Sequence, residues 1–242
     1  MKALVTTKSA IDYQVKVVVK ADESGVETNG VQMSMNPFDA IAVEACVQLQ
    51  EKKHITESTA ITIGEDETVL RQALAMGIHN AARIASTATH TYPKAKLLAD
   101  YIQKNEFDII LMGKLGIDGD HSQIPSMVAG ILDLPCITNA SDIIIKDKKI
   151  EVHKETDDGI AILSMPTPCI ISCDLRLNTP RFVALPKLLQ AKNQPIDVIE
   201  AQAVASDQTT LSVKAPRMRK GNPPTDDLDT FIQQLKDGGI IS

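Results

Sequence analysis

The regular alternation of aliphatic runs with amphipathic stretches constrains the fold of this chain more than any other feature. Strands and helices in alternation build a mainly parallel sheet with helices on both faces. We therefore expect an α/β fold with an aliphatic core, because aromatic residues make up only 3% of the chain. Aliphatic runs predict strands at 2–7, 13–20, 59–64, 82–86 and 107–113, and apolar periodicity predicts helices at 36–53, 65–77, 93–105 and from about 125 to 132.

The second half of the chain departs from this alternation. Residues 142–154 predict two strands joined by a charged turn, and two more strands are predicted at 159–164 and 169–174. Because no helix separates them, we expect a short antiparallel section. From about Gln194 the sequence is polar and irregular, and it ends in a predicted helix at 225–237 with Thr225 as its N-cap.

Composition argues against several classes of protein. The formal net charge of −6 is unfavourable for nucleic-acid binding, and the basic run of Lys214, Arg217, Arg219 and Lys220 is short and lacks interleaved aromatic residues. No stretch approaches the roughly 18 apolar residues of a membrane span, and the first residues lack the pattern of a signal peptide. The four cysteines form no CxxC pair, so we expect free thiols in a reducing compartment.

Ligands of mainly parallel sheets bind outside the carboxyl ends of the strands, so the loops after 2–7, 59–64 and 107–113 are the candidates. The loop at 113–125 carries glycines at three-residue spacing and leads into a predicted helix. Such a loop presents backbone N–H groups to an anion, to which Ser122 and Gln123 could add side-chain donors. The alternative is a tight connection that needs glycine only for its backbone conformation.

The sequence predicts neither catalytic residues nor a metal site. No cysteine or serine motif accompanies His121, and no second histidine stands at metal-ligand spacing. Asp118 and Asp120 lie in a glycine turn, where aspartate usually shapes the turn itself. The common hydrolase signatures are absent from the chain.

Three segments together carry a resemblance to a known family. They are SMNPFDAIAVEA (34–45), ALAMG with GKLGIDGD (73–77 and 113–120), and DLRLNTPRFVALPKLLQAK (174–192). Up to about residue 200 the chain closely resembles the small (beta) subunit of electron transfer flavoproteins. The resemblance implies an adenine-nucleotide-hydrolase-like, Rossmann-type domain over 1–193, with a recognition loop at 174–192. It also implies a C-terminal arm at 194–242 that contacts the large (alpha) subunit.

The resemblance also implies a function without catalytic residues in this chain. The small subunit would bind a structural AMP and support the alpha subunit, which holds most of the contacts to FAD. The heterodimer would accept electrons from acyl-CoA and related dehydrogenases, as in fatty acid β-oxidation, and pass them to a membrane quinone oxidoreductase. It would work in the cytoplasm, or in the mitochondrial matrix of a eukaryote, without inserting into the membrane.

The resemblance assigns residues to two sites. The nucleotide site would comprise Thr6, Asn36, Pro37, Phe38, Asp39, Ile63, Gly113, Lys114, Leu115, Gly116, Ile117, Asp118, Gly119, Asp120, His121, Ser122, Gln123 and Ile124. The docking site for dehydrogenases would comprise Arg176, Asn178, Arg181, Leu185, Pro186, Leu188 and Leu189, with Leu185 as the anchor and the polar residues holding the base of the loop.

Departures from the family pattern leave alternatives open. Ile124 lacks the hydroxyl and Pro125 the backbone N–H that the family presents to a phosphate, and only Lys192 remains of the basic run after the recognition loop. The pattern DGDxxQ at 118–123 also resembles electron-bifurcating relatives, whose small subunit holds a second FAD in place of AMP. A stand-alone adenine-nucleotide enzyme, such as an ATP pyrophosphatase, would need a glycine-rich loop where this chain has residues 6–9.

Overall fold

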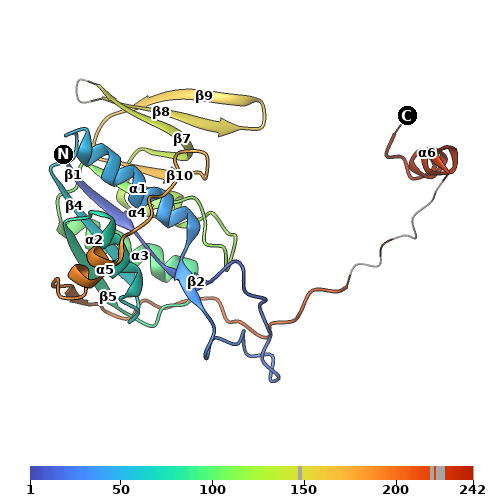
Figure 1. Ribbon diagram of the computed structural model, residues 1–242, viewed down its shortest axis with the longest axis horizontal. Helices are drawn as coiled ribbons and strands as arrows, with labels where there is room; N and C mark the ends of the chain where they lie inside the picture. Colours follow the sequence, from blue (N-terminus) through green and yellow to red (C-terminus); the bar gives the residue numbers. More distant parts are fainter. Residues whose placement is uncertain (147–148, 219–220, 222–226, 242) are drawn as a thin grey trace.

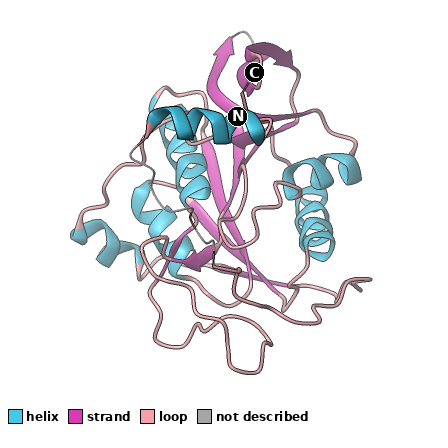
Figure 2. Cartoon of the chain, turned by 90° about the vertical axis from the view of Figure 1, so that its right-hand side faces the viewer, coloured by secondary structure: helices cyan, strands magenta, loops and turns pink. Residues whose placement is uncertain are grey.

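The computed structural model describes residues 1–146, 149–218, 221 and 227–241, and it contains one large sheet with helices on both faces (Figures 1 and 2). The nine strands of this sheet have the order β11-β5-β4-β1-β6-β10-β7-β8-β9. Pairing is parallel from β11 to β7 and antiparallel from β7 to β9. The strands are β1 (Lys2–Thr6), β4 (Glu57–Ile63), β5 (Asn80–Ala85), β6 (Ile109–Gly113), β7 (Cys136–Lys146), β8 (Lys149–Thr156), β9 (Gly159–Met165), β10 (Cys169–Cys173) and β11 (Asp197–Glu200).

The helices complete two apolar layers, one on each face of the sheet. Alternate residues of β1 show the division: Ala3 and Val5 belong to one buried cluster and Leu4 to the other. The first cluster lies under α1 (Pro37–Glu51), α2 (Thr68–Met76) and α5 (Leu185–Ala191), and the second under α3 (Thr91–Lys104) and α4 (Ile124–Leu132). The predicted α/β class with helices on both faces is therefore confirmed.

The predicted strand at 13–20 is wrong. The chain instead forms a small two-stranded sheet from β2 (Ser9–Ile11) and β3 (Met33–Met35), and residues 12–32 project from it as a loop (Figure 1). Only an isolated bridge joins Val19 to Val26 within this loop. Alternating valines satisfy the local preference for extended backbone, but a strand also needs a neighbour, which the protruding loop lacks.

The predicted antiparallel pairing is confirmed for β7, β8 and β9 but is wrong for β10. This strand lies between β6 and β7 and runs parallel to both. The β8–β9 hairpin connects β7 to β10, and β10 therefore enters the sheet in the same direction as β7. The sequence pattern also missed β11, which pairs with β5 in the stretch expected to be irregular.

The C-terminal segment leaves the domain and ends in α6 (Leu228–Asp237), which lies apart from the sheet (Figure 1). None of the α6 residues is buried, and Asp227 caps the helix by accepting from the amides of Asp229 and Thr230. The predicted cap Thr225 and the basic residues Arg219 and Lys220 lie outside the described residues.

Two further expectations from the sequence concern free thiols and membrane-spanning segments. All four cysteines are free thiols, and burial raises the pKa of Cys46 and Cys169 to about 12. Within the described part of the chain, no helix combines the length and the apolar character that crossing a membrane requires.

Candidate functional site

A cavity of about 670 Å³ opens at the carboxyl edge of the parallel sheet. Its walls come from the segments that follow β1, β4, β5 and β6, and from the first turns of α3 and α4. The volume is typical of a small-molecule site, and the position is the one where α/β sheets bind ligands. The fold thus brings together loops that lie far apart in the sequence.

Most of the residues assigned to the nucleotide site line this cavity. Pro37, Phe38 and Ile117 do not, although each is next to a residue that does. The residues that do are Thr6, Asn36, Asp39, Ile63, Gly113, Lys114, Leu115, Gly116, Asp118, Gly119, Asp120, His121, Ser122, Gln123 and Ile124.

The structure adds residues that the sequence analysis missed. The whole segment 86–91 after β5 lines the cavity. Because ligands of parallel sheets bind outside the carboxyl ends of the strands, the loop after the predicted strand 82–86 was also a candidate. The cavity is also lined by Lys8, Lys94 and the tail residues Gln208 and Thr210. None of these residues belongs to a motif that indicated a site in the sequence.

Asn36 joins α1 to the loop after β6. It occupies the N-cap position of α1, but its side chain makes no cap hydrogen bond. Its Nδ2 donates to the carbonyl of Leu115 over 2.8 Å, and its Oδ1 accepts from the backbone N–H of Ile117 over 3.2 Å. The side chain therefore fixes the cavity loop rather than the helix end.

Asp39 lies buried beneath the same loop. Its Oδ2 accepts from the backbone N–H of Lys8 over 2.9 Å, and burial raises the pKa of Asp39 to about 7. A Cβ at Gly113 would lie 2.2 Å from Oδ1 of Asp39 and 2.9 Å from backbone atoms of Phe38 and Asp39. Gly113 is thus required by the close approach of β6 to the first turn of α1.

Lys8 and Asp118 form an ion pair across the cavity wall. The Nζ of Lys8 lies 2.6 Å from both carboxylate oxygens of Asp118. Burial opposes ionisation of Asp118, but the contact with Lys8 lowers its pKa below the ordinary value. A Cβ at Gly116 would lie 2.6 Å from the Asp118 carboxylate and 2.9 Å from Nζ of Lys8, so glycine leaves room for the pair.

The loop before α4 has the features of an anion site. Asp120 and Ser122 adopt left-handed backbone, with φ of 54° and 53°. The amides of Gly119 and Asp120 donate to the carbonyl of Gly116. In the described part of the chain, the amides of His121, Ser122 and Gln123 have no acceptor. Consecutive free amides next to a helix N-terminus form a concavity suited to phosphate.

The described residues contain no group of three or more histidine, cysteine, aspartate and glutamate side chains placed to hold a metal ion. The loop before α4 instead provides hydrogen-bond donors, and both lysines and acids line the rest of the cavity. The cavity can therefore hold an organic anion of nucleotide size, with its negative group at the loop before α4.

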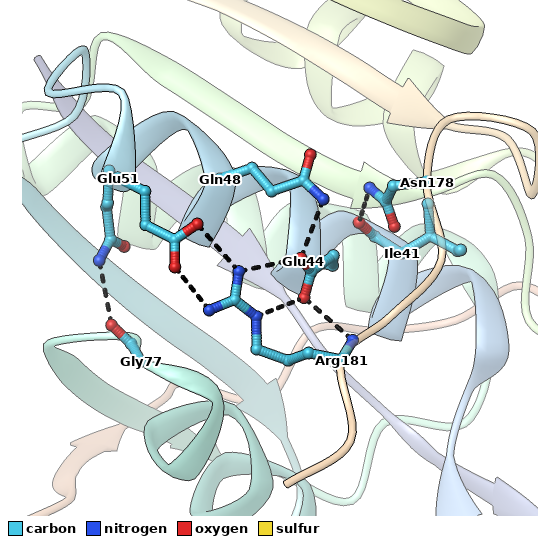
Figure 3. A network of polar contacts seen from close by, with 8 residues as sticks. Ile41, Glu44, Gln48, Glu51, Gly77, Asn178 and Arg181 are labelled. Carbon is cyan, nitrogen blue, oxygen red and sulfur yellow. Dashed lines mark hydrogen bonds and ion pairs between the residues drawn. The ribbon is translucent and has the colours of Figure 1, made fainter.

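The second assigned site, at 174–192, packs against α1 through the network in Figure 3. Arg181 donates to Glu44 from its backbone N–H (3.1 Å), Nε (2.8 Å) and Nη2 (3.0 Å), and to Glu51 from Nη1 (2.7 Å). Burial alone would raise the pKa of Glu44, but the hydrogen bonds from Arg181 and Gln48 lower it below the ordinary value.

Two further contacts hold the start of this segment. Asn178 donates from Nδ2 to the carbonyl of Ile41 over 3.0 Å (Figure 3), and Arg176 forms an ion pair with Glu155 of β8. The polar residues assigned to the docking site thus fix its base to α1 and to the β8–β9 hairpin.

The apolar residues of the segment divide into two groups. Leu188 packs against the core, whereas Leu185 is 67% exposed and Leu189 52% exposed, and Pro186 is also exposed. Phe182 is 96% exposed and was not assigned to the docking site, although a large aromatic residue beside Arg181 was a visible signal. Phe182, Leu185 and Leu189 therefore give this segment an uncovered apolar surface.

Comparison with known proteins finds relatives along the chain. The family model described as "Electron transfer flavoprotein domain" matches residues 24–204. Electron transfer flavoprotein subunit beta of Dictyostelium discoideum is 38% identical over 248 residues, covering 100% of this chain and 99% of that protein. Subunit beta of Bos taurus is 38% identical over 252 residues, with coverage of 100% and 99%. The mitochondrial subunit beta of Oryza sativa is 37% identical over 247 residues, with 98% coverage of each.

Proposed function

Because this chain belongs to the electron transfer flavoprotein family as a beta subunit, we propose that it pairs with an FAD-bearing alpha subunit and carries electrons with it. In this proposal the chain binds one adenine nucleotide and presents a docking segment to electron donors. It contributes no catalytic residue of its own.

The cavity supports AMP as the bound nucleotide. The observation that carries this proposal is the run of free amides from His121 to Gln123 beside the N-terminus of α4, in a cavity that Lys8 also lines. These groups suit one phosphate, and the remaining volume suits a nucleoside. Although Ile124 and Pro125 lack donors that the family presents, the preceding amides remain free for the phosphate.

The segment 174–192 supports docking on acyl-CoA and related dehydrogenases. Arg181 and Asn178 attach it to α1, and Leu185 projects from it as an exposed anchor. Burial of one leucine contributes roughly 1.5–3 kcal/mol, which suits a contact that forms and separates on each electron transfer. Electrons would then pass to the FAD held mainly by the alpha subunit and on to a membrane quinone oxidoreductase.

The segment 194–242 supports an arm that holds the alpha subunit. Leu228 and Phe231 are exposed on α6, and no residue of this helix is buried in the isolated chain. An amphipathic helix without a packing surface in its own domain is suited to a groove on a partner. The proposed place of action is the cytoplasm, or the mitochondrial matrix in a eukaryote.

The test is electron transfer by the assembled heterodimer. The chain would be co-expressed with its alpha subunit, purified as a complex and mixed with an acyl-CoA dehydrogenase and its substrate. The proposal predicts that the flavin absorbance of the complex bleaches only when substrate and dehydrogenase are both present. A complex that forms but stays oxidised with acyl-CoA-type donors would contradict the assigned donors, and failure to form a complex would contradict the subunit role.

A further inference from the structure

Lys94, in the first turn of α3, is a cation of the cavity without a close partner. Its side chain is half-buried, lines the cavity and makes no hydrogen bond or ion pair with any described residue. Burial lowers the pKa of Lys94, and the positive charge of Lys8 lowers it further. A partly buried ammonium group is costly unless it is paired, so the cavity provides a place for a negative charge.

The acid that acts on Lys94 electrostatically already has a close partner. Asp118 influences Lys94 electrostatically, but both of its oxygens contact Nζ of Lys8. Lys8 and Asp118 therefore compensate each other, and Lys94 is left without a close partner among the described residues. Asp120 also lines the cavity, and buried Asp39 lies below with its pKa raised to about 7.

The loop before α4 offers donors to the same negative group. The amides of His121, Ser122 and Gln123 have no acceptor in the described chain, and α4 begins at the next residue. The helices α3 and α4 pack together on one face of the sheet, and the first turns of both line the cavity. Their N-termini carry partial positive charge toward this space.

We propose that Lys94 is a phosphate-binding residue, which holds the phosphate of a nucleoside monophosphate together with Lys8 and the amides of residues 121–123. The inference rests on the proposed nucleotide site and extends it to a second wall, formed by α3. Lys94 then supplies the attraction lost where Ile124 has no hydroxyl and Pro125 has no N–H. A charge-assisted contact of this kind is among the stronger hydrogen bonds in proteins.

The experiment compares AMP with adenosine, which differs only by lacking the phosphate. The full-length chain, dialysed free of nucleotide, is titrated calorimetrically as wild type and as Lys94→Met, Lys94→Arg and Lys96→Met. Lys96→Met is the matched control, because Lys96 lies on the same helix but pairs with Asp100. We expect Lys94→Met to weaken AMP binding roughly 10- to 100-fold and to leave adenosine binding unchanged. Lys94→Arg should retain most of the affinity, and Lys96→Met should behave as wild type.

Two results would overturn the inference. If Lys94→Met binds AMP within about twofold of wild type, or loses AMP and adenosine equally, Lys94 does not bind the phosphate, whereas the nucleotide site itself stands. If wild type binds neither compound, the nucleotide site fails as well. Thermal denaturation of each variant separates these outcomes from a loss of folding.

Discussion

Arg181 is the residue on which the geometry of the docking segment depends most. The Glu44 side chain is only 4% exposed, and Arg181 supplies three of its hydrogen bonds. Removing one partner of a buried pair leaves the other charge without compensation, which costs more than the pair itself contributes. The same residue therefore determines both local stability and the position of the segment.

We expect Arg181→Met to lower the free energy of unfolding by about 3 kcal/mol, measured by urea denaturation. The double variant with Glu44→Gln should recover part of this loss, because it removes the unpaired carboxylate. Lys2→Met is the control: its pair with Glu57 is half-exposed and spans 3.8 Å, so the expected loss is below about 1 kcal/mol. Equal losses for Arg181→Met and Lys2→Met would show that the network does not stabilise the fold.

The raised pKa of Asp39 predicts that the free energy of unfolding depends on pH. Its pKa is raised by burial to about 7 in the folded chain, against about 3.9 in an unfolded chain. Between these values the unfolded chain releases the proton first, so the wild type loses stability as pH rises from about 4 to about 7. Asp39→Asn cannot ionise and should gain stability relative to wild type over this window, with no further gain above it.

The measurement is the free energy of unfolding of wild type and Asp39→Asn without nucleotide, at several pH values between 4 and 8. The groups around Asp39 are the Lys8 amide and charge, Asn36, Asp118 and Cys173. A stability difference that stays constant across the window would exclude a raised pKa for Asp39.

At this scale the sequence predicted the loop residues of the cavity, including Lys114, but not Lys8 or Lys94. Glycine spacing and strand ends identify a loop such as 113–124, because backbone geometry has a local signature. Lys94 belongs to a helix that is distant in sequence, and its position depends on how α3 packs beside α4. Asn36 was predicted at the correct position, but its contacts with Leu115 and Ile117 arise only in the folded chain.

Among the elements, α5 combines a leucine that packs against the core with leucines that are exposed. Leu188 fixes it to the core, while Leu185 and Leu189 face outward. Docking and stability should therefore be separable within one short helix, because different leucines serve them.

We expect Leu185→Ala to reduce the second-order rate of flavin reduction by a dehydrogenase roughly 10- to 100-fold, with the melting temperature unchanged. The loss follows from the apolar burial that one leucine would contribute to the complex. Ile162→Ala is a matched control, since this β9 residue is 61% exposed but belongs to another surface. Unchanged reduction by Leu185→Ala would remove Leu185 as the anchor.

The sequence predicted elements with strong local patterns and failed where pairing is non-local. The helices α1 to α4 and the strands β1, β4, β5 and β6 lie within a few residues of the expected ranges. The failures at 13–20, β10 and β11 concern which strand lies beside which, and in which direction. Residue periodicity carries no information on a neighbour that is distant in sequence.

At the scale of the whole molecule, the C-terminal segment extends away from the α/β domain (Figure 1). Val213 donates from its backbone N–H to the carbonyl of Glu23 over 2.8 Å, so the segment is fixed to the projecting loop 12–32 before it leaves the domain. Beyond this contact, α6 presents Leu228 and Phe231 to solvent. This arrangement favours contact with a second protein.

We expect Phe231→Ala to weaken association with the alpha subunit at least tenfold without changing the melting temperature of the isolated chain. The side chain belongs to neither buried cluster of the isolated chain, but it would be buried in a groove of the partner. Gln233→Ala, on the opposite side of α6, should leave association unchanged. Equal association of both variants with the alpha subunit, measured by calorimetry, would exclude α6 from the interface.

The nucleotide content of the assembled protein tests the central claim most directly. The heterodimer with the alpha subunit would be purified and denatured, and the released nucleotides would be separated and quantified. The account predicts one AMP and one FAD per heterodimer, with AMP held in the cavity at the carboxyl ends of β1, β4, β5 and β6. Two FAD and no AMP would contradict this assignment and give the chain a flavin of its own, and FAD without any second nucleotide would contradict the nucleotide site itself.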